Sequence, residues 1–256
     1  MIQAVEIFKA SCVQAIQHGP AAMKTSWGIV LLYAWGSFAG FRENAPETAS
    51  MIWGIALIFI AALMIAALAI VMHRKCLLPT QDQALATADR RAMVKTYAWR
   101  WALMILPLFV VGIAVFLLWF LPSHSEDADL VDISGENPFL SPAFQFAANA
   151  MIAVLMWVFY RIALGLPHLA CGQGWLNWSE SWAATAPMSG QIAFLSLIAT
   201  AVPYAVDTAV MSVIVAPSGW SAILYDVVYM IVSTIVGAAM LTQIYLRAFP
   251  AAANED

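Results

Sequence analysis

Two carboxylates stand where acidic side chains are rare, well inside long apolar stretches of the sequence. Asp207 and Asp226 lie on either side of a turn at residues 216–219. Inside a bilayer a carboxylate is costly, and it normally faces a bundle interior or a water-filled cavity. One hypothesis is an intramembrane proton or cation site, with Pro203 interrupting the helical backbone ladder nearby. The alternative is two buried acids that bond to neighbouring hydroxyl groups and serve packing.

Basic side chains at the ends of two apolar stretches are the second set of candidates. His73, Arg74 and Lys75 follow the second stretch, and Arg161 lies near the end of the fourth. Such residues either cap the cytoplasmic edge of a helix or bind anionic lipid headgroups. We therefore treat these four residues as lipid-headgroup candidates.

No motif of an established catalytic centre occurs in the sequence, which has no GxSxG, P-loop, HExxH or GxGxxG pattern. The cysteines Cys12, Cys76 and Cys171 fit no metal-binding spacing. His168 and Glu180 offer two ligands where a metal site needs at least three. We expect no enzyme activity, no metal or other cofactor, and no nucleic-acid partner, which would need a clustered basic face.

The elements that position these residues must be largely apolar. Hydrophobic residues make up 63% of the 256 residues and charged residues 10%, and the mean hydropathy is +0.81. A soluble domain is nearer to half apolar and one quarter charged. The excess apolar surface therefore has to face lipid, and the sequence predicts an integral membrane protein.

Six apolar stretches have the length needed to cross a bilayer. About twenty helical residues, at about 1.5 Å each, span about 30 Å of hydrocarbon. Tryptophan and tyrosine gather near the ends of these stretches, as in aromatic belts at membrane interfaces. The sequence thus predicts an all-α polytopic membrane bundle that forms one domain over residues 1–256. The stretches cover about 25–41, 51–72, 99–121, 142–164, 190–215 and 220–246.

The segments between these stretches are predicted to hold shorter helices. Residues 1–24 form an N-terminal arm, in which an amphipathic helix over 2–18 is ended by Gly19-Pro20. The arm lacks the uninterrupted apolar region of a signal peptide, so the first stretch is expected to direct insertion itself. Whether the arm docks on lipid or on protein is left open. Another short helix is expected over 83–96.

The distribution of basic residues predicts the orientation in the membrane. With the N-terminus inside, ten of the eleven lysines and arginines fall in inside segments, and only Arg42 lies outside. The segment 122–141 carries five acids and no basic residue, and it belongs outside on this assignment. We therefore expect a multi-pass protein of the bacterial inner membrane with both termini in the cytoplasm.

Three stretches carry a resemblance to a known family. AIVMHRKCLL covers residues 69–78, YRIALGLP covers 160–167 and WSESWAAT covers 178–185. Together they resemble the uncharacterised bacterial six-helix inner-membrane proteins of the YciC family and the membrane domain found beside some glycerophosphodiester phosphodiesterases. The resemblance implies an inner-membrane domain loosely associated with envelope upkeep. It falls on His73, Arg74, Leu77, Arg161, Pro167, Ser181 and Trp182.

Two classes of function fit these features. The first is a non-enzymatic scaffold or lipid-interacting module, with the bilayer and anionic lipid as partners, and with a second copy or another membrane protein as open alternatives. The second is a small transporter or permease that uses Asp207 and Asp226 as its proton or cation site. The observation that separates them is whether both aspartates face one cavity that is open to the outside.

Overall fold

The computed structural model describes residues 2–40, 47–78, 87–123, 142–213 and 220–250. Within these ranges the backbone is almost entirely helical and has no strand, so the predicted all-α class is confirmed. The elements are α1 (Ile2–Gly40), α2 (Glu47–Leu77), α3 (Thr87–Ser123), α4 (Pro142–Ile162), α5 (Gly165–Ala170), α6 (Trp178–Thr185), the 3-10 turn η2 (Ala186–Met188), α7 (Ser189–Val213) and α8 (Trp220–Ala248).

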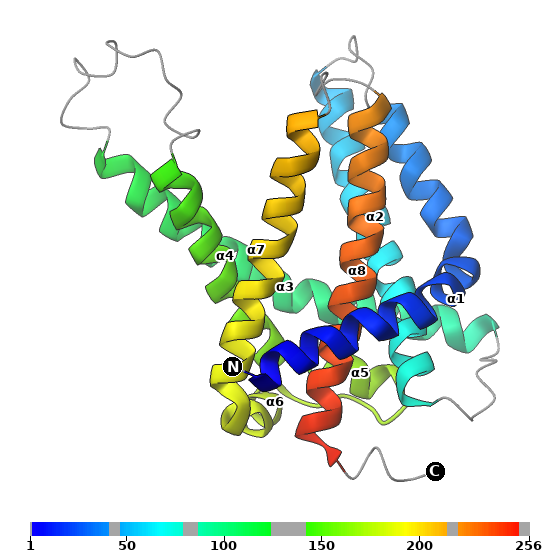
Figure 1. The fold of residues 1–256 in the computed structure, drawn as a ribbon. Coiled ribbons are helices and arrows are strands. Elements are labelled where there is room, and N and C mark those ends of the chain that lie inside the picture. The colour runs from blue at the N-terminus through cyan, green and yellow to red at the C-terminus, as the bar shows by residue number, and fades with distance from the viewer. Residues whose placement is uncertain (1, 41–46, 79–86, 124–141, 214–219, 251–256) are drawn as a thin grey trace.

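α1 is one long helix whose two halves run in different directions (Figure 1). The first half lies across α8 and α7, and the second half runs along α2. The expectation that Gly19-Pro20 ends the arm is wrong, because Pro20 lies inside the helix. Proline removes one backbone hydrogen bond and bends a helix, but the chain can continue when packing holds both sides. Gly19 supplies such packing, since it lies against Ile235 of α8.

The first half of α1 docks on the protein through a narrow face. Ala4, Ile7 and Ser11 are fully buried there. Val13 and Ile16 are exposed, so the same segment also offers apolar side chains to its surroundings. The sequence left open whether the arm docks on lipid or on protein. In the structure, one face of the arm is covered by the protein itself.

Five helical segments in the described part of the chain are long and apolar enough to cross a membrane. They correspond to the second to sixth predicted stretches, while the second half of α1 is not among them. The separate helix expected over 83–96 is instead the start of α3, which continues unbroken from Thr87 into the third stretch. Residues 79–86 lie outside the described residues.

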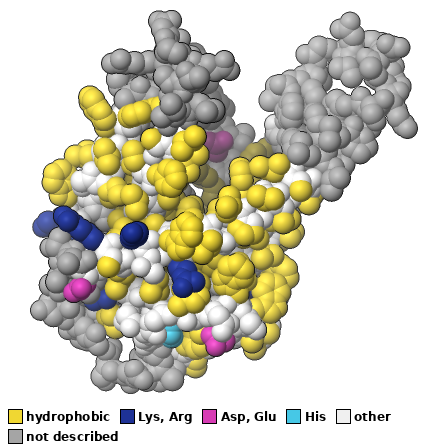
Figure 2. All heavy atoms as spheres, turned by 180° about the vertical axis from the view of Figure 1, so that it is seen from behind, with side chains coloured by type: hydrophobic (Ala, Val, Ile, Leu, Met, Phe, Trp, Pro, Cys, Tyr) yellow, Lys and Arg dark blue, Asp and Glu magenta, His cyan; other side chains and the backbone are white. Residues whose placement is uncertain are grey.

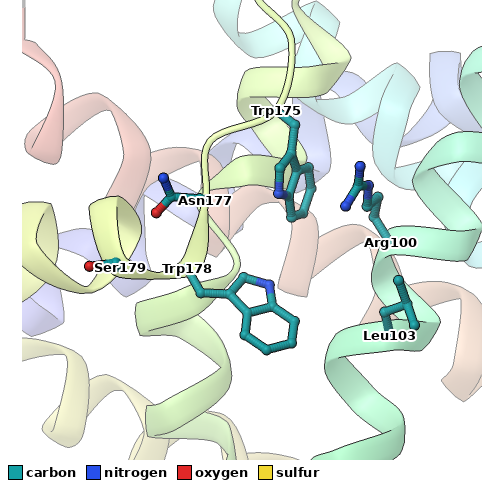
Figure 3. Close-up of a pocket in the computed structure, with 6 residues that line it drawn as sticks. All are labelled: Arg100, Leu103, Trp175, Asn177, Trp178 and Ser179. Atoms are coloured by element: carbon teal, nitrogen blue, oxygen red, sulfur yellow. The ribbon is translucent and has the colours of Figure 1, made fainter.

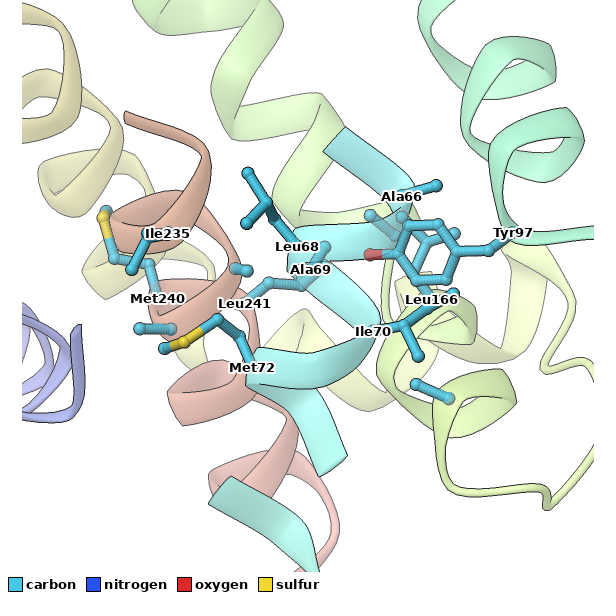
Figure 4. Packing of buried hydrophobic residues seen from close by; sticks show 14 of the residues in the cluster. Ala66, Leu68, Ala69, Ile70, Met72, Tyr97, Leu166, Ile235, Met240 and Leu241 are labelled. Carbon is cyan, nitrogen blue, oxygen red and sulfur yellow. The ribbon is translucent and has the colours of Figure 1, made fainter. Parts of the chain in front are cut away.

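α2 is the central helix of the bundle. Residues 66–73, in its second half, are almost all buried, and Leu68 and Met72 are examples. In Figure 4 this part of α2 lies between α8, which contributes Met240, and the helices α3 and α5. Near its start, by contrast, Ile58 and Phe59 are exposed. A helix that is apolar all round needs protein or lipid on every face, and α2 has protein at one end and an open apolar surface at the other.

The short helices α5 and α6 lie at the same end of the bundle as the first and last described residues (Figure 1). We call this region the polar end and define it by His73, Arg161, His168 and Tyr245. Above it α7 packs mainly on α4, whereas α8 packs on α1 and α2. The helices α7 and α8 are consecutive in sequence but therefore belong to different parts of the bundle.

Candidate functional site

His73 lies at the polar end with no exposed surface. Its Nδ1 is 2.7 Å from the Thr242 hydroxyl oxygen on α8, and its Nε2 is 2.9 Å from the Tyr97 hydroxyl oxygen on α3. The Thr242 hydroxyl donates its proton to the Ala238 carbonyl. With all three bonds formed, Nδ1–H of His73 donates to Thr242 and Nε2 accepts from Tyr97. One neutral imidazole thus ties α2, α3 and α8 together.

A second histidine–tyrosine pair lies nearby in the same end. His168 Nδ1 on α5 is 2.9 Å from the Tyr245 hydroxyl oxygen on α8. Tyr245 donates to the Gln173 side-chain oxygen at 3.0 Å, so His168 is the donor in the first bond. Burial lowers the pKa of His168, and smaller effects of Gln173 and of the Glu180 carboxylate oppose this. The ring is therefore neutral at pH 7.

The Arg74 side chain forms a hydrogen bond within the described residues, whereas the side chain of its neighbour Lys75 does not. The Arg74 Nη1 donates to the Ala170 carbonyl at 3.0 Å and so joins α2 to α5, while its Nε is buried without a partner. Lys75 is half-buried and forms no hydrogen bond or ion pair with any part of the chain that the structure describes. Of these two cations, Lys75 is therefore the one whose charged group stays unbonded within the described residues.

Arg161 is buried between two tryptophans. Its guanidinium carbon lies 3.6 Å from the ring centre of Trp182 and 5.4 Å from that of Trp157. Its Nη2 donates to the Trp182 carbonyl at 2.9 Å, and its Nε donates to the Thr185 hydroxyl at 3.3 Å. A desolvated cation–π contact contributes about 2 kcal/mol. Arg161 therefore fastens α6 to the end of α4.

Two of the four lipid-headgroup candidates do not fit that prediction. His73 is fully buried, and Arg161 is 6% exposed. Both side chains direct polar atoms to neighbouring helices, and neither has the exposed surface that a headgroup would need. Arg74 and Lys75 stay candidates, with Arg74 already bonded to Ala170.

The two aspartates lie far along α7 and near the start of α8. Asp207 is half-buried and within electrostatic reach of the hydroxyl groups of Tyr225 and Tyr229. Asp226 is exposed and lies within reach of Tyr33 on α1 as well as of Tyr225. One carboxylate thus faces tyrosines between helices, and the other is at the surface.

A groove runs beside α8 where it separates from α7 and α4. One part, of about 380 Å³, faces α7 and α1, and the other, of about 220 Å³, faces α2 and α3. The two parts share Met156, Tyr160, Ser233 and Gly237. Neither predicted aspartate lines either part. The transporter hypothesis requires both carboxylates on one cavity, and this groove does not provide it.

A further groove, of about 320 Å³, lies between α3 and the segment that leads into α6. Arg100 and Leu103 form one wall, and Trp175 and Trp178 form the other (Figure 3). The Arg100 guanidinium carbon is 4.8 Å from the ring centre of Trp175. Within the described residues Arg100 has no hydrogen bond or ion pair. None of these four residues was predicted from the sequence to form a site.

The loop beside this groove needs glycine at particular positions. Gly172 and Gly174 have φ angles of 79° and 90°, which residues with a Cβ rarely adopt. A Cβ on Gly165 would lie 2.6 Å from the Leu176 carbonyl oxygen and 3.0 Å from the Trp175 ring. The absent side chain of Gly165 therefore lets the loop and its indole sit directly on α5.

The start of α6 is fixed by a capping box. The Asn177 side chain accepts from the Glu180 backbone N–H at 2.9 Å, and the Glu180 carboxylate accepts from the Asn177 N–H at 3.0 Å. Trp178, the first helical residue, therefore has a defined position. In Figure 3 the side chains of Asn177 and Ser179 point away from the space between Trp178 and α3.

Other basic side chains lie on the surface near the start of α3. Arg90 Nη2 donates to the Thr25 carbonyl at 3.0 Å, which joins α3 to α1. Arg91 and Lys95 are exposed and form no hydrogen bond or ion pair with the rest of the described chain. Figure 2 shows lysine and arginine side chains at one level of the molecule, below a broad hydrophobic area.

The metal and cysteine chemistry of the described residues is limited. No three His, Cys, Asp or Glu side chains among them gather into a group that could hold a metal ion. The cysteines Cys12, Cys76 and Cys171 are all free thiols.

Comparisons with protein-family models, with curated proteins and with solved structures gave no match. Functional inference therefore starts from the geometry of the polar end.

Proposed function

We propose that this protein is a non-enzymatic, lipid-interacting module of the bacterial inner membrane, with anionic lipid bound at its polar end. The observation that carries the proposal is the set of unpaired cations along α3, namely Arg91, Lys95 and Arg100. None of them has a carboxylate partner among the described residues. Each basic residue close to an anionic membrane surface contributes about 1 kcal/mol of attraction. The expected orientation, with the polar end in the cytoplasm, places them at such a surface.

Two further observations favour binding over catalysis at this end. Both ring nitrogens of His73 and the Nδ1 of His168 are committed to hydroxyl groups. Burial raises the pKa of the Cys171 thiol to about 11, with a smaller opposing effect of Arg74, so it is protonated at neutral pH. His73 and this thiol are thus poor candidates for a general base and a nucleophile.

Native mass spectrometry of the full-length protein from mixed micelles tests the proposal. With equal amounts of phosphatidylglycerol and phosphatidylcholine at low salt, we expect retained lipid to be enriched in phosphatidylglycerol. The enrichment should fall as salt rises, because exposed charges are screened. It should also fall in an R91Q/K95Q variant and persist in K9Q, which removes an exposed lysine of α1. Retained lipid that mirrors the bulk mixture in the unchanged protein would contradict the proposal.

A further inference from the structure

We propose that the groove formed by Arg100, Leu103, Trp175 and Trp178 binds the phosphodiester headgroup of a membrane lipid. This inference rests on the proposed lipid-binding function and assigns it to one site. The groove has a volume of about 320 Å³. Its chemistry combines a cation that has no partner among the described residues with aromatic and aliphatic walls. A charged headgroup on an apolar chain requires this combination.

Arg100 is the group that selects an anion. Its guanidinium is oriented by the Trp175 ring, 4.8 Å away, and is only half-buried. Stacking holds the plane of the guanidinium while leaving its N–H groups unbonded within the described chain. A planar fork of N–H donors matches two oxygens of a phosphate group. The side chain is therefore held in place before any ligand arrives.

The carboxylate that follows Trp178 in the sequence does not compete for this cation. Glu180 lies two residues after Trp178, and its carboxylate accepts from the Asn177 backbone N–H in the capping box. It forms no ion pair with Arg100 in the described structure. In Figure 3 the indole nitrogen of Trp178 is on the side of its ring that faces Arg100, so a second N–H donor borders the same space.

The apolar part of α3 continues from this groove in the direction that lipid chains would take. Leu103, Leu106 and Val110 follow Arg100 at helical spacing, and all three are exposed. A phosphate at Arg100 would therefore let an acyl chain lie along these apolar side chains. A soluble phosphate would leave this apolar surface unused, and for this reason we assign the site to a lipid.

Lipid titration by native mass spectrometry tests the assignment on the full-length protein in neutral micelles. With phosphatidylglycerol as the probe, R100Q should bind at least about tenfold more weakly, as expected for loss of charge-assisted hydrogen bonds. R100K should show an intermediate loss, because it keeps the charge but not the fork. K9Q, which removes an exposed lysine of α1, should change binding less than twofold. R91Q removes a matched arginine of α3 and should weaken binding less than R100Q does. Thermal unfolding of each variant in the same micelles checks that the fold is kept.

Three outcomes would overturn the assignment. Equal weakening by R100Q and R91Q would show a diffuse basic surface, and it would leave the proposed function standing. Unchanged binding in both R100Q and R100K would show that the lipid does not bind at Arg100, and it would also leave the proposed function standing. Full displacement of the lipid by millimolar glycerol 3-phosphate would assign the groove to a soluble phosphate. By contrast, an unchanged protein with no preference for phosphatidylglycerol over phosphatidylcholine would remove the proposed function itself.

Discussion

Single polar residues inside this bundle act as ties between helices. His73 bonds to two other helices, and Arg161 bonds to α6. Several hydroxyl groups that reach no other helix return to their own backbone, as Ser11 does to the Ile7 carbonyl at 2.7 Å. In a membrane no water is present to satisfy such groups, so each needs an internal partner. The polar residues of the interior therefore help to fix the positions of the helices relative to one another.

Removing one partner of His73 should destabilise the bundle. Tyr97→Phe deletes the hydroxyl that bonds to Nε2 and leaves this acceptor unsatisfied in the interior. We expect a loss of about 1–3 kcal/mol in the free energy of unfolding, measured by denaturant titration in micelles. Tyr204→Phe is the control, since its hydroxyl bond to Gln145 is exposed, and it should change stability by less than about 0.5 kcal/mol. Equal effects of the two variants would contradict this role of His73.

The His168–Tyr245 pair should make stability depend on pH. Burial lowers the folded-state pKa of His168 below its ordinary value of 6.5, so the unfolded chain binds the proton more readily. Its contribution is therefore complete above about pH 6.5 and is lost as the pH falls through the folded-state pKa. We expect the melting temperature to fall between pH 7 and pH 5, and to fall less in His168→Gln. An identical slope in the two proteins would refute the argument.

At the scale of elements, the close approach of α5 to the Trp175 loop depends on Gly165. A methyl group there would meet the Leu176 carbonyl oxygen at 2.6 Å, and backbone cannot yield as a flexible side chain does. Gly165→Ala should therefore cost about 1–3 kcal/mol, as overpacking does. It should also change the near-ultraviolet circular dichroism, because Trp175 must shift.

Gly190→Ala is the matched control for this change. A Cβ on Gly190 meets no other atom within 4 Å, so no loss of packing is expected. Alanine in place of an exposed helical glycine is neutral or stabilising. If Gly165→Ala behaved like Gly190→Ala, the loop would not depend on this close contact.

The helices were predictable from the sequence where one local property defines them. α4, α7 and α8 begin within a few residues of their predicted starts, because a change from polar to apolar residues marks the edge of each stretch. The two errors arose where local rules met tertiary packing. Pro20 bends α1 without ending it, and the polar residues after Thr87 extend α3 before its apolar part begins.

The candidate site was less predictable, because burial depends on distant parts of the chain. His73 contacts Tyr97, which is 24 residues away in the sequence, and Thr242, which is 169 residues away. No local sequence pattern predicts those contacts. Arg161 likewise meets Trp182 only after α6 folds back. For Arg100 the available signal was its position between Trp99 and Trp101, a cation among interfacial aromatic residues.

At the scale of the whole molecule, the number of membrane crossings follows from where the chain ends lie. Gln3 bonds to Gln191 near the start of α7, and Tyr245 bonds to His168, so both ends of the described chain lie at the polar end. Ends on one side require an even number of crossings. Five apolar helices meet the length and composition needed to cross. We therefore expect the second half of α1, which runs along α2, to be the sixth.

Topology reporters test this count and the expected orientation together. Green fluorescent protein fluoresces only in the cytoplasm, and alkaline phosphatase is active only outside it. We expect fluorescence from fusions at either end of the chain, and phosphatase activity from a fusion within residues 122–141, the segment with five acids and no basic residue. A phosphatase fusion within 79–86 should be inactive. Opposite results at the two ends would mean an odd number of crossings, with α1 lying on the membrane throughout. Uniformly inverted results would keep six crossings but would place Arg91, Lys95 and Arg100 away from the cytoplasmic leaflet, where the proposed lipid binding expects them.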